Sequence, residues 1–283
     1  MTKLLNIIIT IITFLLIACT PSLFENQQFN ISKYIRTVKK TSSYIFHPQD
    51  ITFTNKISNI DRNLFPFFIE PLINSLMILF SSLIIAFIFS FIFTYLLYSN
   101  KFIKRYYVKL NTFLSIIPDI FYIPFAISLV VIFYQYTDIL LFNIADDYQN
   151  KAIVFPILVL SIIPFVNSST YLNSILDDES NSNYIQFSKS KGLTKKELFY
   201  HHILRNLTIS YLINFKHIIW ITLSSLLLLE RIFNIHGLSS FIFDYGDPEV
   251  LFVTFILIYI PISLSLLFIE KIITRMTGIQ GGL

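Results

Sequence analysis

Residues 72–98 read LINSLMILFSSLIIAFIFSFIFTYLLY and contain no charged side chain. A helix that crosses the hydrocarbon core of a bilayer needs about 20 predominantly apolar residues, so this stretch is long enough to span a membrane. The stretch is apolar on all sides instead of alternating, which excludes a strand of a membrane β-barrel. It therefore predicts a transmembrane helix.

The composition of the whole chain agrees with a membrane protein. The chain has 283 residues, of which 54% are apolar and only 13% are charged. Soluble domains carry about 25% charged residues, and the few charged residues of this chain cannot cover this much apolar surface. The high hydrophobicity excludes a disordered chain. The single Cys19 excludes a disulfide scaffold.

Five further stretches resemble the first in length and apolar character. They are residues 4–20, 112–136, 152–171, 207–229 and 250–269. Several contain a proline, which a transmembrane helix tolerates where neighbouring helices satisfy the freed carbonyl groups. The sequence thus predicts an all-α membrane protein in which about six transmembrane helices pack as a bundle.

The loop charges predict the orientation. Residues 99–111 carry four basic residues and no acidic one, whereas residues 137–151 carry three aspartates and one lysine. Short basic loops stay in the cytoplasm, so both termini are expected to be cytoplasmic. Residues 21–71 carry six basic residues and are nevertheless expected outside, because long segments escape the rule.

Cys19 leaves two interpretations open for the first stretch. Residues 16–19 read LIAC, which resembles the cleavage box of a secreted lipoprotein, with lipidation of Cys19 after cleavage. The alternative is an ordinary first transmembrane helix that contains a cysteine. Five more spans follow, so a lipid anchor would add little, and this favours the second interpretation.

The polar segment 177–206 is predicted to form two short helices with a break between them. Asn181 or Ser182 suits the cap of the first helix, and Gly192 suits the left-handed position that ends it. Thr194 and Glu197 have the spacing of a capping box that begins the second. Such a helical knob suits docking into a groove on a cytoplasmic partner.

Four motifs in this order carry a resemblance to a known family. Residues 184–193 read YIQFSKSKGL and 202–207 read HILRNL, similar to the YVRTARAKGL and HALRNAL signatures of permease subunits in peptide/nickel-type ABC importers. Residues 230–239 resemble the family's E-x-x-F-x-x-x-G-L-G element, with Ser239 at the last glycine. Residues 115–118 read SIIP and resemble, with one more residue between Ser115 and Pro118, the Ser-x-Pro pattern that opens its third span.

The resemblance implies a fold, partners and a role for the polar segment. The fold is the type I ABC importer permease bundle, with residues 1–71 as a first helix plus external segment and residues 72–283 as the core. The implied partners are two cytoplasmic ATP-binding subunits, a second permease subunit that is a homologue, and an external substrate-binding protein. The implied ATPase-coupling residues are Tyr184, Ile185, Ser188, Gly192, Leu193, His202, Arg205 and Asn206.

Polar residues within the predicted spans are candidates for the substrate pathway, because such residues are costly in a membrane. Lys216, Asn214 and Glu230 are the candidates. Lys216 either faces the pathway, meeting a substrate carboxylate or Glu230, or extends to the cytoplasmic interface. Asn74, Asn167, Asn173 and Asn214 either line the conduit or make interhelical hydrogen bonds.

Other functions find little support in the sequence. There is no glycine-rich phosphate loop with a lysine, so neither ATP binding nor catalysis is expected of this chain, and no cofactor is expected. His201 and His202 are adjacent and point apart on a helix, which disfavours a metal site with His217. The basic residues lie at membrane edges, where anionic lipid explains them better than nucleic acid. A stand-alone secondary carrier or a membrane assembly component remains the alternative to a plasma-membrane importer subunit.

Overall fold

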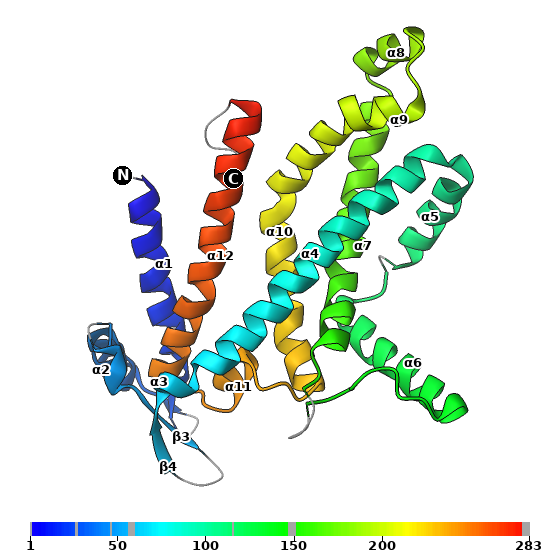
Figure 1. Cartoon of the computed structure of the whole chain (residues 1–283). Helices are drawn as coiled ribbons and strands as arrows, with labels where there is room; N and C mark the ends of the chain where they lie inside the picture. The colour runs from blue at the N-terminus through cyan, green and yellow to red at the C-terminus, as the bar shows by residue number, and fades with distance from the viewer. Residues whose placement is uncertain are drawn as a thin grey trace. The chain divides into compact units, whose positions relative to one another are not determined.

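The computed structural model describes residues 2–25, 28–45, 47–55, 60–114, 116–146 and 151–278, and it is mostly helical (Figure 1). Within these residues, five helical segments are long and apolar enough to cross a membrane. They are Ile69–Ser99, Asp119–Thr137, Val154–Ser180, Lys195–Ile232 and Pro248–Thr277. The predicted all-α membrane fold is confirmed.

The first predicted span is shorter than the others. It forms α1 (Thr2–Ala18), of 17 residues, and its apolar part is Leu5–Ala18. At 1.5 Å per residue this helix is about 26 Å long, slightly less than a hydrocarbon core of about 30 Å. The predicted six spans are therefore five long helices and one shorter apolar helix in the described part of the chain.

One of two compact units comprises Met1–Leu76 and His236–Ser263. It contains α1, α2 (Ile31–Ser43), α3 (Leu64–Phe67), α11 (Leu238–Phe243) and the first parts of α4 (Ile69–Ser99) and α12 (Pro248–Thr277). Two antiparallel hairpins pair β1 (Phe24–Glu25) with β2 (Gln28–Phe29) and β3 (Thr52–Asn55) with β4 (Ile60–Asn63). Short 3-10 turns η1 (Thr20–Leu23) and η2 (Pro48–Asp50) complete it.

In this unit α1 packs on the first part of α12. Ala18, Leu251 and Phe252 form the buried centre, and the Phe14 ring meets the Tyr259 ring edge-on at 5.5 Å. Cys19 is buried behind α1, and its Sγ lies 3.7 Å from Thr41 Oγ1.

The second unit comprises Met77–Ile235 and Leu264–Leu283. It contains α5 (Lys101–Leu114), α6 (Tyr122–Thr137), α7 (Val154–Ser180), α8 (Asn183–Ser190), α9 (Lys195–Leu198) and α10 (Leu204–Ile232), with the 3-10 turn η3 (Asp119–Phe121) and the π-helical turn η4 (Phe199–Ile203). Its centre is α7 packed along α10, and the buried Tyr211 ring meets Phe87 of α4 at 5.1 Å.

The predicted start of the third span at residue 112 is wrong. Residues 101–111 of the predicted loop 99–111 are helical in α5, and this helix ends at Leu114. Pro118 has no N–H group and disfavours helical conformation at Ile117, so the chain breaks here and a new helical segment begins at Asp119. Ser115 of the proposed Ser-x-Pro motif lies outside the described residues.

The helix of the fourth span is longer than predicted. Its hydropathy falls after residue 171, but α7 continues to Ser180 because residues 172–180 contain no proline or glycine that would end a helix. Hydropathy marks where apolar character ends, and a helix can continue past that point into polar surroundings. This extension carries Asp177 and Glu179 to the base of the next segment.

Candidate functional site

Residues 177–206, called the hairpin below, form the two short helices that the sequence predicts. In Figure 1, α8 and α9 lie beyond the adjoining ends of α7 and α10. Ser182 is the N-cap residue of α8, but its hydroxyl donates to the Glu179 carbonyl at 2.6 Å instead of accepting from α8. The predicted cap position is thus confirmed, whereas the predicted capping bond is wrong.

The break between the two helices is the one predicted. Gly192 has φ of +82°, and a Cβ atom added there would meet nothing within 4 Å. Its constraint is therefore the backbone angle, which glycine adopts without penalty, and not lack of space. The hairpin turn depends on this residue for a conformational reason.

The capping box that begins α9 is also confirmed. The Glu197 amide donates to Thr194 Oγ1 at 3.3 Å, and the Thr194 amide donates to Glu197 Oε2 at 2.7 Å. From Leu198 the chain continues through the π-helical turn Phe199–Ile203 into α10. No signal in the sequence marks this turn, although such bulges within α-helices are often found at functional sites.

A partly exposed polar network joins the hairpin to α7 and α10. Tyr184 of α8 donates its hydroxyl proton to Glu179 Oε2 at the end of α7. Asn206 Nδ2 of α10 donates to the same Oε2 at 3.1 Å and lies 3.2 Å from the Tyr184 hydroxyl. Partial burial, and then the hydrogen bond to the Glu179 carboxylate, raise the pKa of Tyr184, so the phenol remains a donor at neutral pH. Three helices therefore converge on one carboxylate.

Sequence reasoning missed Glu179. The residue lies beyond the apolar stretch, and the prediction for this segment was based on its basic residues and its motifs. Asn206 and Tyr184 were singled out through the resemblance, and the structure brings them together on this carboxylate. An acidic residue one turn before a predicted helix cap was the available signal.

Further polar contacts join the hairpin to other helices of the same unit. Arg205 Nη2 donates to the Met276 carbonyl of α12 at 2.8 Å, and Lys195 Nζ donates to the Ser99 carbonyl of α4 at 3.3 Å. Lys104 of α5 makes an ion pair with Asp177. A displacement of the hairpin would therefore be felt at the ends of α4, α5 and α12.

The remaining predicted coupling residues differ in exposure. Ile185 is fully buried and Ser188 nearly so, whereas Tyr184 and Gly192 are exposed and Leu193 and His202 are half-buried. Ile185 and Ser188 thus hold α8 on its support. Phe187 on the outer side of α8 is 62% exposed, with Lys191 Nζ 4.5 Å from the centre of its ring. The hairpin presents an aromatic and basic outer surface.

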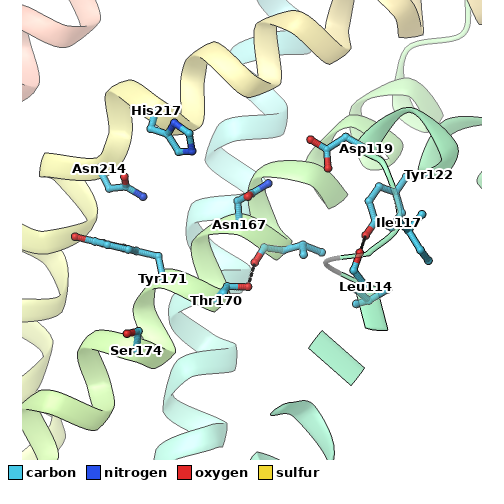
Figure 2. Close-up of a pocket in the computed structure, with 11 residues that line it drawn as sticks. Leu114, Ile117, Asp119, Tyr122, Asn167, Thr170, Tyr171, Ser174, Asn214 and His217 are labelled. Carbon is cyan, nitrogen blue, oxygen red and sulfur yellow. Dashed lines mark hydrogen bonds between the residues drawn. The ribbon is translucent and has the colours of Figure 1, made fainter. Parts of the chain in front are cut away.

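A polar cavity of about 510 Å³ lies between the helices of the same unit. Figure 2 shows its lining, which comes from the break before α6, from α7 and from α10. The polar lining residues are Asp119, Tyr122, Asn167, Thr170, Tyr171, Ser174, Asn214 and His217. Of the three main pathway candidates, Asn214 lines this cavity, and so does Asn167, one of the asparagines for which two alternatives were open.

Hydrogen bonds within the wall fix several of these side chains. Thr170 Oγ1 donates to Asn111 Oδ1 of α5 at 2.9 Å. Tyr122 donates its hydroxyl proton to the Leu114 carbonyl at 3.0 Å, as a dashed line in Figure 2 marks. Asn167 Nδ2 donates to the Ile163 carbonyl of its own helix at 3.0 Å. The broken span is thereby held against α7.

The other two pathway candidates lie elsewhere. Lys216 is exposed and is not part of the cavity lining, and Glu230 is fully buried fourteen residues further along α10. That separation is about 21 Å along one helix, which excludes a direct contact between the two. Asn74 donates to the His236 carbonyl at 3.1 Å in the first unit. Sequence reasoning missed Asp119, because it was placed inside a span with no reason to face a cavity.

Within the described residues, no group of three or more histidine, cysteine, aspartate or glutamate side chains could hold a metal ion. Three histidines lie in the hairpin and in α10. His201 and His217 are exposed, and His202 is half-buried with its ring 6.4 Å from the Tyr184 ring.

Comparison with known proteins gives the class. Residues 83–278 match the family described as the binding-protein-dependent transport system inner membrane component. The match covers more than half of the chain, and the chain belongs to this family of multi-pass inner membrane permease components, which are not catalytic subunits. The predicted resemblance is confirmed at this level.

A curated relative narrows the comparison. The chain is 27% identical over 153 residues to the dipeptide transport system permease protein DppB of Lactococcus lactis subsp. cremoris (strain MG1363). The similarity covers 53% of this chain and 50% of that protein. The chain thus spans about half the length of the curated relative that it matches.

Proposed function

We propose that this chain is the permease subunit of an ABC importer for peptides, and that the hairpin couples it to cytoplasmic ATPases. The observation that carries the proposal is the hairpin's attachment to its unit. The hairpin, whose turn is at Gly192, joins α7 and α10 through the Glu179 carboxylate and reaches α4 and α12 through Lys195 and Arg205. The similarity to a dipeptide permease supports a peptide as substrate.

Coupling follows from the mechanics of this attachment. A small element moves larger ones only when the contacts at its base are stiffer than those at its tip. The base consists of buried Ile185 and Ser188 and of charge-assisted hydrogen bonds, whereas the tip exposes Phe187 and Lys191. An ATPase groove that takes the exposed surface would therefore move α7 and α10 together, and these two helices form much of the cavity wall.

The proposal includes partners and an orientation. Two ATP-binding subunits dock on the hairpins of a permease pair made from this chain and a homologue, and an external binding protein delivers the substrate. The basic hairpin and both termini lie in the cytoplasm, following the charge of the short loops. Residues 1–71 precede the permease core as an accessory helix and external segment.

Reconstitution of the importer tests this function. The wild-type chain, purified with its partners in proteoliposomes, is expected to import a labelled dipeptide with ATP and binding protein present. The ATPase is expected to co-purify with the wild-type chain and to be lost with Gly192→Val, while Gly192→Asn, which tolerates the left-handed backbone angle, serves as the control. Equal ATPase recovery in wild type and Gly192→Val would overturn the coupling role, and absence of dipeptide uptake would overturn the substrate.

A further inference from the structure

The polar cavity is uneven in charge. Among the described residues that line it there is one carboxylate, Asp119, and one imidazole, His217, but no lysine or arginine. The other polar groups are neutral hydroxyls and amides. Ionisable residues within membrane-spanning segments are costly and mark substrate or ion pathways. The cavity is therefore suited to a cation and poorly suited to an anion.

The position of Asp119 results from the broken span. Pro118 ends the preceding segment, and Asp119 is the first residue of the 3-10 turn that leads into α6. In Figure 2 the Asp119 side chain lies across the cavity from Asn214 and His217 of α10, with Asn167 of α7 between them. A group that enters the cavity meets the carboxylate on one side and amide groups on the other.

The geometry points to a substrate-contact site in which Asp119 holds the ammonium group at the amino end of a passing peptide. Asn167 and Asn214 are placed to hydrogen-bond the peptide amide, and the volume of about 510 Å³ suits a small ligand. This inference rests on the proposed function, since it names how the same permease receives its substrate. The peptide carboxylate finds no cationic partner among the described lining residues and must be held elsewhere or stay hydrated.

The physical reason is the cost of moving a charge out of water. An ammonium group loses its hydration in a narrow conduit, and a fixed carboxylate offsets part of this penalty through a strong Coulomb interaction at reduced dielectric. Removal of that carboxylate raises the free energy of the cation in the cavity and leaves a neutral substrate unaffected. The site is thus selective by charge.

A thiol-labelling experiment on the assembled importer measures the charge of the cavity without a substrate. The permease chain carries Cys19→Ser, which removes its native thiol, and Asn214→Cys, which places one thiol in the cavity. This thiol is labelled with either cationic 2-aminoethyl or anionic 2-sulfonatoethyl methanethiosulfonate. The intact mass of the permease chain measures the rate of each labelling reaction. Addition of Asp119→Asn is expected to lower the cation-to-anion rate ratio by about ten-fold or more. Asp119→Glu is expected to preserve the ratio, and a Tyr136→Cys control on exposed α6 is expected to show no effect of Asp119→Asn. An unchanged ratio at Asn214→Cys would overturn the inference.

Protection of the same cysteine connects the charge to the substrate. A dipeptide with a free amino end is expected to slow labelling of Asn214→Cys. Its N-acetylated form is expected to need at least about ten-fold higher concentration for the same protection. A dipeptide with a C-terminal amide is expected to protect like the free acid. Equal protection by the acetylated form would overturn ammonium recognition. Absence of protection by any peptide, both at Asn214→Cys and at Ser174→Cys in the same lining, with the charge ratio intact, would instead overturn the proposed peptide substrate.

Discussion

The hairpin is built from thirty consecutive residues, whereas the cavity is built from three segments that lie far apart in the chain. Most bonds that shape the hairpin join residues three to five apart, such as Thr194 with Glu197 and Tyr184 with Glu179. The cavity exists only because a broken span packs against α7 and α10. The hairpin is thus a locally specified part, to which the proposed function assigns the transmission of motion, and the cavity is a tertiary part, to which it assigns the reception of substrate.

The largest effect is expected from the residue on which the hairpin turn depends. Gly192→Val places a β-branched side chain at φ of +82°, where an L-residue loses about 1–2 kcal/mol and a β-branched one more. We expect ATP-driven uptake to be abolished while the variant is inserted in the membrane at wild-type abundance.

Gly192→Asn is the matched control, because asparagine tolerates the left-handed region. It is expected to keep most of the uptake. Wild-type uptake in Gly192→Val would show that the hairpin turn is not needed for coupling and would remove the distinction between a transmitting and a receiving part.

A smaller effect is expected at the base of the hairpin. Tyr184→Phe removes the hydroxyl that donates to Glu179, and the free energy that holds α8 on its support should fall by about 1 kcal/mol. Faster amide hydrogen exchange in α8 measures the change. Tyr200→Phe, an exposed tyrosine of the π-helical turn, is the control.

A double-mutant cycle assigns this effect to the pair of residues. Glu179→Gln combined with Tyr184→Phe should destabilise α8 less than the sum of the single variants, because the first weakens and the second removes the same hydrogen bond. Strict additivity would mean that the two side chains do not stabilise the hairpin together.

A local effect is expected at the start of α9. Thr194→Ala removes the N-cap oxygen that accepts from the Glu197 amide, and such changes destabilise a helix by about 0.5–1 kcal/mol. Exchange should quicken for the amides of Lys195–Leu198 and not for those of α8. Thr194→Ser retains the oxygen and is expected to behave like the wild type, so fast exchange in both variants would contradict the capping role.

The difference between the two regions also explains what the sequence predicted. Gly192 and the Thr194–Glu197 box follow from local chemistry, and both predictions are confirmed. Asp119 was missed because its role depends on packing between segments about fifty and one hundred residues apart, which no local pattern encodes. The predicted third span runs through Pro118 because the sequence stays apolar across this position, although the helix is broken there.

The smallest effect is expected at Lys216, for which the sequence left two alternatives. The side chain is exposed and outside the cavity lining, which favours the alternative in which the aliphatic stem lies along the helix surface and the ammonium group extends to the interface. Lys216→Met should then change dipeptide uptake less than about two-fold, as exposed substitutions away from special features usually do. Because Asp119→Asn removes a charge of opposite sign inside the cavity, the two variants measured together separate a residue that the substrate meets from one that only lies on the same helix as the cavity wall. A loss of uptake in Lys216→Met as large as that in Asp119→Asn would place Lys216 on the pathway, and the receiving part of the molecule would then extend along α10 beyond the cavity.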